Sequence, residues 1–235
     1  SEMCIRDSLI LFIVFSALCV ICLAFSSDFG TALIFFVTFL VISFMRSGSI
    51  ATVALAITGA GMAGFLMLKM KDHVARRFAT WGHIWDAENI WDGGYQQTHA
   101  LSAGASGGLF GKGAGNGWLK NTFAGNTDTV FGVMCEELGL IGACVIMIIF
   151  ALLILRGFWI ALHARDRFGA LLVVGIMTHL ALQTFLNIAV VSGFVPTTGI
   201  SLPFFSYGGT ALCLQLVEMG IVLSVSRQIP APKAG

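Results

Sequence analysis

Long apolar runs are the feature that most constrains how this 235-residue chain can fold. They recur along the chain at about the 20-residue length with which a helix crosses the hydrocarbon core of a bilayer. In lipid, only helices and closed barrels satisfy all their backbone hydrogen bonds internally. The pattern predicts six membrane helices, over residues 9–26, 29–45, 50–69, 130–155, 168–192 and 204–225.

Composition supports the same class of protein. The chain is 57% hydrophobic and only 11% charged, a balance with which a soluble domain could not cover its surface. We therefore expect an all-α, polytopic membrane protein. The net charge of +1 and the lack of a basic cluster predict no nucleic-acid partner. Cys19 and Cys22 form a C-x-x-C within an apolar run, where packing is favoured over a metal or redox site.

The charges of the short loops predict the orientation. Two short loops, around Asp28 and over residues 193–201, contain no Lys or Arg. The basic residues of the other short loops and of the tail are Arg46, Arg156, Arg165, Arg167, Arg227 and Lys233. Because cytoplasmic loops carry the excess of Lys and Arg, both ends are expected in the cytoplasm and the long loop outside.

This topology divides the chain into five parts. Residues 1–8 are interpreted as a non-native or truncated start, and residues 9–69 as three membrane helices. Residues 70–129 form a long extracellular loop with a glycine-rich segment. Residues 130–226 form three more membrane helices, and residues 227–235 a cytoplasmic tail.

The long loop contains two kinds of segment. Trp81, Trp85 and Trp91 follow two arginines, as in an aromatic belt at the headgroup level of a membrane. Seven glycines then lie within residues 102–117. This segment lacks the residue order of a Walker loop and of a dinucleotide-binding loop. Its backbone amides and its lysines could hold a phosphate, or it could be a plain flexible loop.

Acidic and amide side chains lie beside this loop. Asp128 directly precedes the fourth span, and Glu136 and Glu137 lie about 12 Å further along it. Ionisable groups at such depth usually face a cavity or a partner. Alternatively, Asp128 caps the helix and the glutamates pair with Lys or Arg. Gln183 and Asn187, one turn apart in the fifth span, could line the same cavity or join helices.

The segment before the last span contains helix-breaking residues. Pro196, Pro203 and the pair Gly208 and Gly209 interrupt the helical pattern. Broken backbone at membrane depth is tolerated where protein buries it or where it lines a cavity. We expect this segment to form a second wall of the site that the long loop builds.

Ordered blocks of residues carry a resemblance to a known family. The array PTTGISLPFFSYGGT at 196–210 resembles the signature of the SEDS family (shape, elongation, division and sporulation), the RodA/FtsW/SpoVE group. Three further matches are SDFGT at 27–31, GYQ at 94–96, and GGLFGKGAGNG at 107–117 followed by Thr127-Asp128 and EELG at 136–139. The resemblance implies the last six helices of a ten-helix fold, and it leaves open whether this chain alone is active.

The resemblance also implies a chemistry. Family members are peptidoglycan glycosyltransferases of the bacterial cytoplasmic membrane, with an outward-facing active site. They polymerise lipid II into β-1,4 glycan strands and release undecaprenyl pyrophosphate. Asp128 matches the family's essential aspartate and is the expected catalytic base. No cofactor is certain, although a divalent cation, Mg or Mn, could bind the pyrophosphate. The expected partners are lipid II, membrane lipid and a class B penicillin-binding protein, which is a transpeptidase.

The expected substrate-binding residues come from the matched blocks and from the charges around them. They are Lys112, Lys120, Gln96, Glu136, Glu137, Gln183, Asn187, Thr198, Ser206 and Tyr207. No metal-ligand cluster is predicted. The sequence FAGNTDT at 123–129 departs from the family's LPExHTDF, which leaves open whether the chain serves elongation, division or sporulation.

Two other functions remain as alternatives. A flippase or transporter of lipid-linked precursors also needs a polar cavity within the membrane. A non-catalytic membrane scaffold of a cell-wall complex needs only a docking surface. The enzyme hypothesis differs from both because it requires Asp128 for polymerisation.

Overall fold

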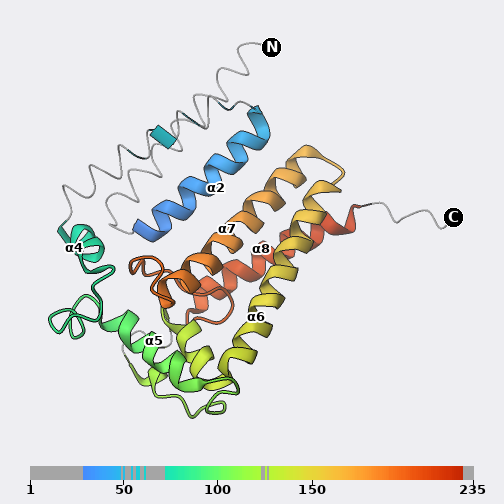
Figure 1. Cartoon of the computed structure of the whole chain (residues 1–235). Coiled ribbons are helices and arrows are strands. Elements are labelled where there is room, and N and C mark those ends of the chain that lie inside the picture. Colours follow the sequence, from blue (N-terminus) through green and yellow to red (C-terminus); the bar gives the residue numbers. More distant parts are fainter. Residues whose placement is uncertain are drawn as a thin grey trace.

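The computed structural model describes residues 29–48, 50, 54, 57, 58, 61, 72–122, 125 and 127–229. Every regular element in these residues is helical, which confirms the all-α class (Figure 1). The elements are α2 (Phe29–Ser47), α4 (Asp72–Thr80), α5 (Tyr95–Gly107), the 3-10 turn η1 (Leu119–Asn121), α6 (Val130–Leu162), α7 (Arg167–Val191) and α8 (Gly209–Arg227). The predicted span 9–26, most of the span 50–69, the start 1–8 and the cysteines at 19 and 22 lie outside the described residues.

Three described helices are long and apolar enough to cross a membrane: α6, α7 and α8. The apolar part of α2, Gly30–Arg46, is shorter. Helix α7 is the centre of the bundle, since 56% of its most apolar window is buried, against 17% for α6 and for α8. Helices α2, α6 and α8 all pack against it (Figure 1). The outer faces of α6 and α8 remain apolar, as lipid contact requires.

Two boundaries of the described spans differ from the predicted ones by more than two residues. Helix α6 continues to Leu162, seven residues beyond the predicted end, because no proline interrupts it. Helix α8 begins at Gly209, not at residue 204. Pro203 cannot continue a helix, and Phe204 takes a left-handed conformation with φ 63°. The turn that they form keeps residues 204–208 out of the helix.

The long loop is largely structured. It contains α4, α5 and η1, and α5 packs against α6 across the end of the bundle opposite the α6–α7 turn (Figure 1). The α6–α7 turn carries Arg165, and Asp166 caps α7 by accepting a hydrogen bond from the Gly169 amide at 2.7 Å. The two ends of the bundle therefore differ: one carries the loop elements, and the other a short basic turn.

Candidate active site

The glycine-rich segment is docked against a break in α6. The break is at Gly139, whose φ of 71° and ψ of −176° are not helical. The two amides that follow it donate outside the helix: Leu140 to the Gly108 carbonyl at 2.9 Å, and Ile141 to the Leu109 carbonyl at 3.2 Å. The segment thus supplies acceptors to amides that the break removes from the helical ladder.

Two hydrogen bonds run in the opposite direction. The amide of Lys112 donates to the carbonyl of Glu136, and the amide of Gly113 to the carbonyl of Glu137, each at 3.0 Å. The break at Gly139 deprives these two carbonyls of the amides that would donate to them in a regular helix. Helix and loop therefore complete each other's backbone hydrogen bonding, so the segment is not a plain flexible loop.

Glu136 is a fully buried anchor for this loop. Its side chain has 0% exposure. The carboxylate pairs with Lys112 Nζ at 2.8 Å and accepts from the amides of Trp118 at 3.2 Å and Leu119 at 3.1 Å. A buried carboxylate needs this degree of compensation, because each unmade bond costs the full desolvation of the group.

Glu137 repeats the arrangement one residue on. It accepts from the amides of Gly115 at 2.9 Å and Gly117 at 3.2 Å, and it pairs with Lys120 Nζ at 3.4 Å. Lys120 Nζ also donates to the Gly115 carbonyl. Gly117 has to approach closely, because a Cβ there would lie 2.9 Å from Glu136 Oε2. The backbone amides of the loop therefore donate to the carboxylates of Glu136 and Glu137.

The structure therefore shows the pairing of the glutamates with lysines that the sequence left as an alternative. The side chains of Lys112 and Lys120 are still 34% and 31% exposed. Their predicted contact with a pyrophosphate, like that of Glu136 and Glu137 with substrate, stays a prediction.

Asp128 lies at the start of α6, just outside its N-cap position, which Thr129 occupies. Asn187, which is 0% exposed, donates through Nδ2 to the carbonyls of Asp128 at 2.8 Å and Ile200 at 2.7 Å. A Cβ on Gly199 would lie 4.0 Å from Asp128 Oδ2. The Asp128 carboxylate therefore lies beside the backbone of the segment before α8.

Ser206 joins the same backbone from the other side. Its Oγ donates to the Thr127 carbonyl at 2.8 Å and accepts from the Leu202 amide at 2.8 Å. Asn187 and Ser206 together hold the carbonyls of two consecutive residues, Thr127 and Asp128. Both side chains position the aspartate through its backbone.

Hydrogen bonds tie the long loop to the segment before α8. Arg77 donates to the Thr197 carbonyl at 3.2 Å, and the Trp81 indole to the Gly193 carbonyl at 3.1 Å. Gln97, with 3% exposure, donates through Nε2 to the carbonyls of Val190 at 3.0 Å and Val195 at 2.7 Å. These two hydrogen bonds attach α5 to the C-terminal end of α7.

Two buried glutamines of this region, Gln97 and Gln215, were not predicted from the sequence. Gln97 follows directly after Gln96, the glutamine of the GYQ block, yet Gln97 is the one that is buried and bonded. Gln215 accepts from the amide of Phe204 at 2.9 Å and is 6% exposed. A polar residue within an otherwise apolar helix was the available signal for Gln215.

The other predicted residues are placed differently. Thr198 is buried, and within the described residues its hydroxyl has no hydrogen-bond partner; the same holds for Gln183 Oε1. Tyr207 is 87% exposed. In mid-helix, His179 lies 3.3 Å from Glu218 across α7 and α8. These positions do not test substrate contact, which stays a prediction.

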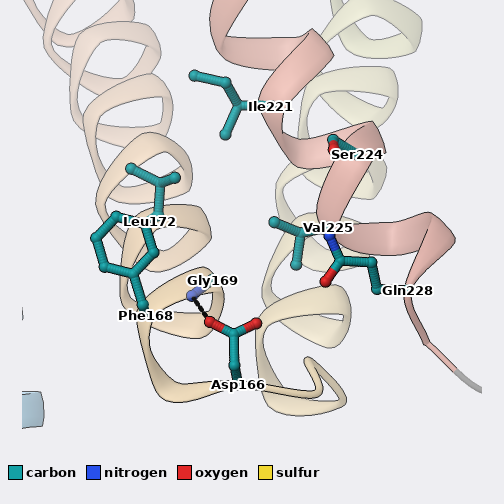
Figure 2. A pocket seen from close by; sticks show the side chains of 8 residues that line it. All are labelled: Asp166, Phe168, Gly169, Leu172, Ile221, Ser224, Val225 and Gln228. Carbon is teal, nitrogen blue, oxygen red and sulfur yellow. Dashed lines mark hydrogen bonds between the residues drawn. The ribbon is translucent and has the colours of Figure 1, made fainter.

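A cavity of about 410 Å³ lies elsewhere, between the start of α7 and the end of α8 (Figure 2). Leu172, Val225 and Gln228 line it, and its carboxylate, Asp166, is used to cap α7. It lies at the end of the bundle opposite the glycine-rich segment and shares no residue with that site. We assign it no part in the chemistry.

Metal binding does not fit the two α6 carboxylates that hold the loop. Glu136 and Glu137 direct their oxygens at lysines and backbone amides. No group of three or more His, Cys, Asp or Glu side chains gathers anywhere in the described part of the chain. The predicted Mg or Mn ion stays a prediction, and no step is assigned to it.

The fold and the site define a class: a polytopic helical membrane protein with a pinned, glycine-rich loop and an aspartate at one end of its bundle. The sequence model of the FtsW/RodA/SpoVE family, described as cell cycle proteins, matches residues 3–230. The chain belongs to this family, as its motifs indicated.

Relatives from several bacteria are similar to the chain. Stage V sporulation protein E of Bacillus subtilis is 38% identical over 219 residues, 92% of this chain and 58% of that protein. Peptidoglycan glycosyltransferase RodA of Mycobacterium leprae is 33% identical, over 89% of this chain and 45% of the relative. A probable peptidoglycan glycosyltransferase FtsW of Geobacter metallireducens is 41% identical, over 70% and 44%. The chain spans about half the length of these relatives.

A solved structure supports the fold. It is described as "Structural coordination of polymerization and crosslinking by a peptidoglycan synthase complex". The match has a TM-score of 0.68 at 24% identity and covers 89% of this chain and 59% of the other. At that identity, the likeness concerns the fold.

Proposed function

We propose that the protein is a lipid II polymerase, an inverting peptidoglycan glycosyltransferase, with Asp128 as its catalytic base. The observation that carries the proposal is the placement of Asp128. Asn187 and Ser206 hold its backbone and that of the preceding residue, and its carboxylate lies beside Gly199. The names of the RodA and FtsW relatives, peptidoglycan glycosyltransferases, support the same activity.

The proposed step balances without further reactants. The acceptor's GlcNAc 4-hydroxyl attacks the anomeric carbon of the lipid-linked donor, and the Asp128 carboxylate takes its proton. The bond from that carbon to the pyrophosphate breaks, and the electron pair leaves with undecaprenyl pyrophosphate. A β-1,4 bond forms with inversion. Lys112 and Lys120 stabilise the leaving charge from their pairs with the glutamates.

Asp128→Asn in the full-length protein tests this proposal. A missing general base is expected to lower lipid II polymerisation by about 10²–10⁴-fold. The bond from Asn187 is retained in this variant, because it uses the backbone carbonyl of residue 128. Asp86→Asn, an exposed aspartate of the same loop, is the control and should keep its activity. Polymerisation that survives Asp128→Asn refutes the base assignment. Protein-dependent passage of lipid II across vesicle membranes would then favour the flippase.

The setting of this activity is also a proposal. The basic α6–α7 turn lies at the opposite end of the bundle from Asp128, which favours an outward-facing site. A class B penicillin-binding protein is the proposed partner, since the similar solved structure is described as coordinating polymerisation and crosslinking. Co-purification of the two full-length proteins tests this pairing.

A further inference from the structure

Four aromatic rings form a connected row next to the glycine-rich loop. Trp91 lies before α5, Tyr95 and His99 lie one turn apart on α5, and Trp118 lies at the end of the loop. The ring centroids are 5.9 Å apart for Trp91 and His99, 4.0 Å for Tyr95 and His99, and 5.7 Å for His99 and Trp118. We call these four residues the aromatic row.

Hydrogen bonds that do not use the ring faces hold His99, Trp118 and helix α5 in place. His99 Nδ1 lies 2.8 Å from the Tyr95 carbonyl, which orients the imidazole along α5. The Trp118 amide donates to the buried carboxylate of Glu136. Gln97 ties α5 itself to the end of α7. His99 and Trp118 therefore belong to a fixed surface, and a ligand need not order these two residues on binding.

Part of the row is open to solvent. Trp91 is 76% exposed and Trp118 is 39% exposed, while Tyr95 and His99 between them are half-buried. The two exposed rings thus flank a partly covered middle. An extended ligand that contacts two separated rings fits this arrangement better than a compact one.

The chemistry of the row suits a sugar chain. A pyranose ring has an apolar face of C–H groups and a rim of hydroxyls. Indole and phenol rings offer a matching apolar face, with an N–H or O–H at the edge for the hydroxyls. A bare anion is disfavoured, because the exposed carboxylates of Asp86 and Asp92 lie in the same turn as Trp91.

We propose that the aromatic row binds the glycan portion of the substrate or product, a β-1,4-linked N-acetylhexosamine chain. This inference rests on the proposed polymerase function. The row and Asp128 lie at the same end of the bundle: Trp118 and Leu119 both bind Glu136 of α6, near the start of the helix that Asp128 precedes. A growing strand that leaves the catalytic aspartate would reach the row without crossing the bilayer.

Binding of a soluble oligosaccharide tests the row separately from catalysis. The full-length protein in detergent would be titrated with tetra-N-acetylchitotetraose by calorimetry and by saturation-transfer NMR. Saturable binding is expected, and Trp91→Ala and Trp118→Ala should each raise Kd about tenfold. Trp85→Ala is the matched control: an indole of the same loop, 57% exposed and outside the row, whose loss should change Kd by less than about twofold.

The outcomes separate the two proposals. Asp128→Asn should bind the oligosaccharide as the parent does, so a failed base assignment leaves the row intact. Three results would overturn the row itself. These are no saturable binding by the parent, an equal loss on Trp85→Ala, or row variants that keep their Kd and only lose retention in lipid nanodiscs. The last result would identify the row as an interfacial anchor.

Discussion

Replacing Gly139 by alanine should undock the glycine-rich segment from α6. The glycine has φ 71° and ψ −176°, a conformation that is essentially restricted to glycine and costs another residue about 1–3 kcal/mol. An added Cβ would also lie 2.3 Å from the Gly111 nitrogen and 2.5 Å from the Leu109 oxygen. Both are backbone atoms, so no rotation of a side chain relieves the contact.

The magnitude follows from what has to move. If the segment retreats, four backbone hydrogen bonds to α6 are lost: Leu140 to Gly108, Ile141 to Leu109, Lys112 to Glu136 and Gly113 to Glu137. Each contributes about 0.5–1.5 kcal/mol. The lost hydrogen bonds are the cost of undocking. Keeping the segment docked costs the Gly139 strain of about 1–3 kcal/mol and, in addition, the contacts of the added Cβ with backbone atoms. The strain alone shifts the balance toward the undocked state by at least about fivefold.

The assay combines proteolysis and activity. Limited proteolysis within residues 107–117 should become at least about tenfold faster in Gly139→Ala, because an undocked loop is cleavable. Lipid II polymerisation by the full-length protein should fall in parallel. Gly220→Ala is the control, since Gly220 is helical and a Cβ there meets nothing within 4 Å. Unchanged proteolysis and activity in Gly139→Ala would refute the docking argument.

Three further tests concern the hydrogen bonds of the site. Glu136→Gln should destabilise the loop by leaving Lys112 without its counter-charge, and Lys112→Met in the same protein should restore part of the melting temperature; additive losses would contradict the pair. Asn187→Leu removes two bonds and should lower thermal stability by about 1–3 kcal/mol and the polymerisation rate; an unchanged rate would show that Asp128 needs no such support. Gln97→Leu should lower the melting temperature more than Gln96→Leu, and the reverse order would contradict the assignment.

Much of the fold could be predicted from local sequence. The apolar runs of α6 and α7 could be predicted as membrane helices without knowledge of their packing partners, because length and composition alone indicate a membrane-spanning helix. The predicted start of the last helix was wrong, since the turn at Phe204 depends on the distant Gln215 for the acceptor of its amide. The aromatic and apolar residues of this turn are as typical of a membrane span as of a turn.

The candidate site divides in the same way. The TD and EELG blocks identified Asp128, Glu136 and Glu137 as residues to examine, and family membership confirmed the resemblance. The sequence left open whether the glutamates pair with cations or face a substrate. The tertiary structure shows their lysine partners and the backbone amides that donate to them.

By itself, the sequence determined the class of the protein, the family and the aspartate to mutate first. Composition and short motifs are sufficient for these conclusions, because both can be recognised from residues that are close together along the chain. The tertiary structure decided which glutamine closes the end of α7 and what the loop lysines bind. Lys112 and Glu136 are 24 residues apart, and Gln97 and Val190 are 93 residues apart. Such contacts depend on how helices pack, and no local pattern encodes them.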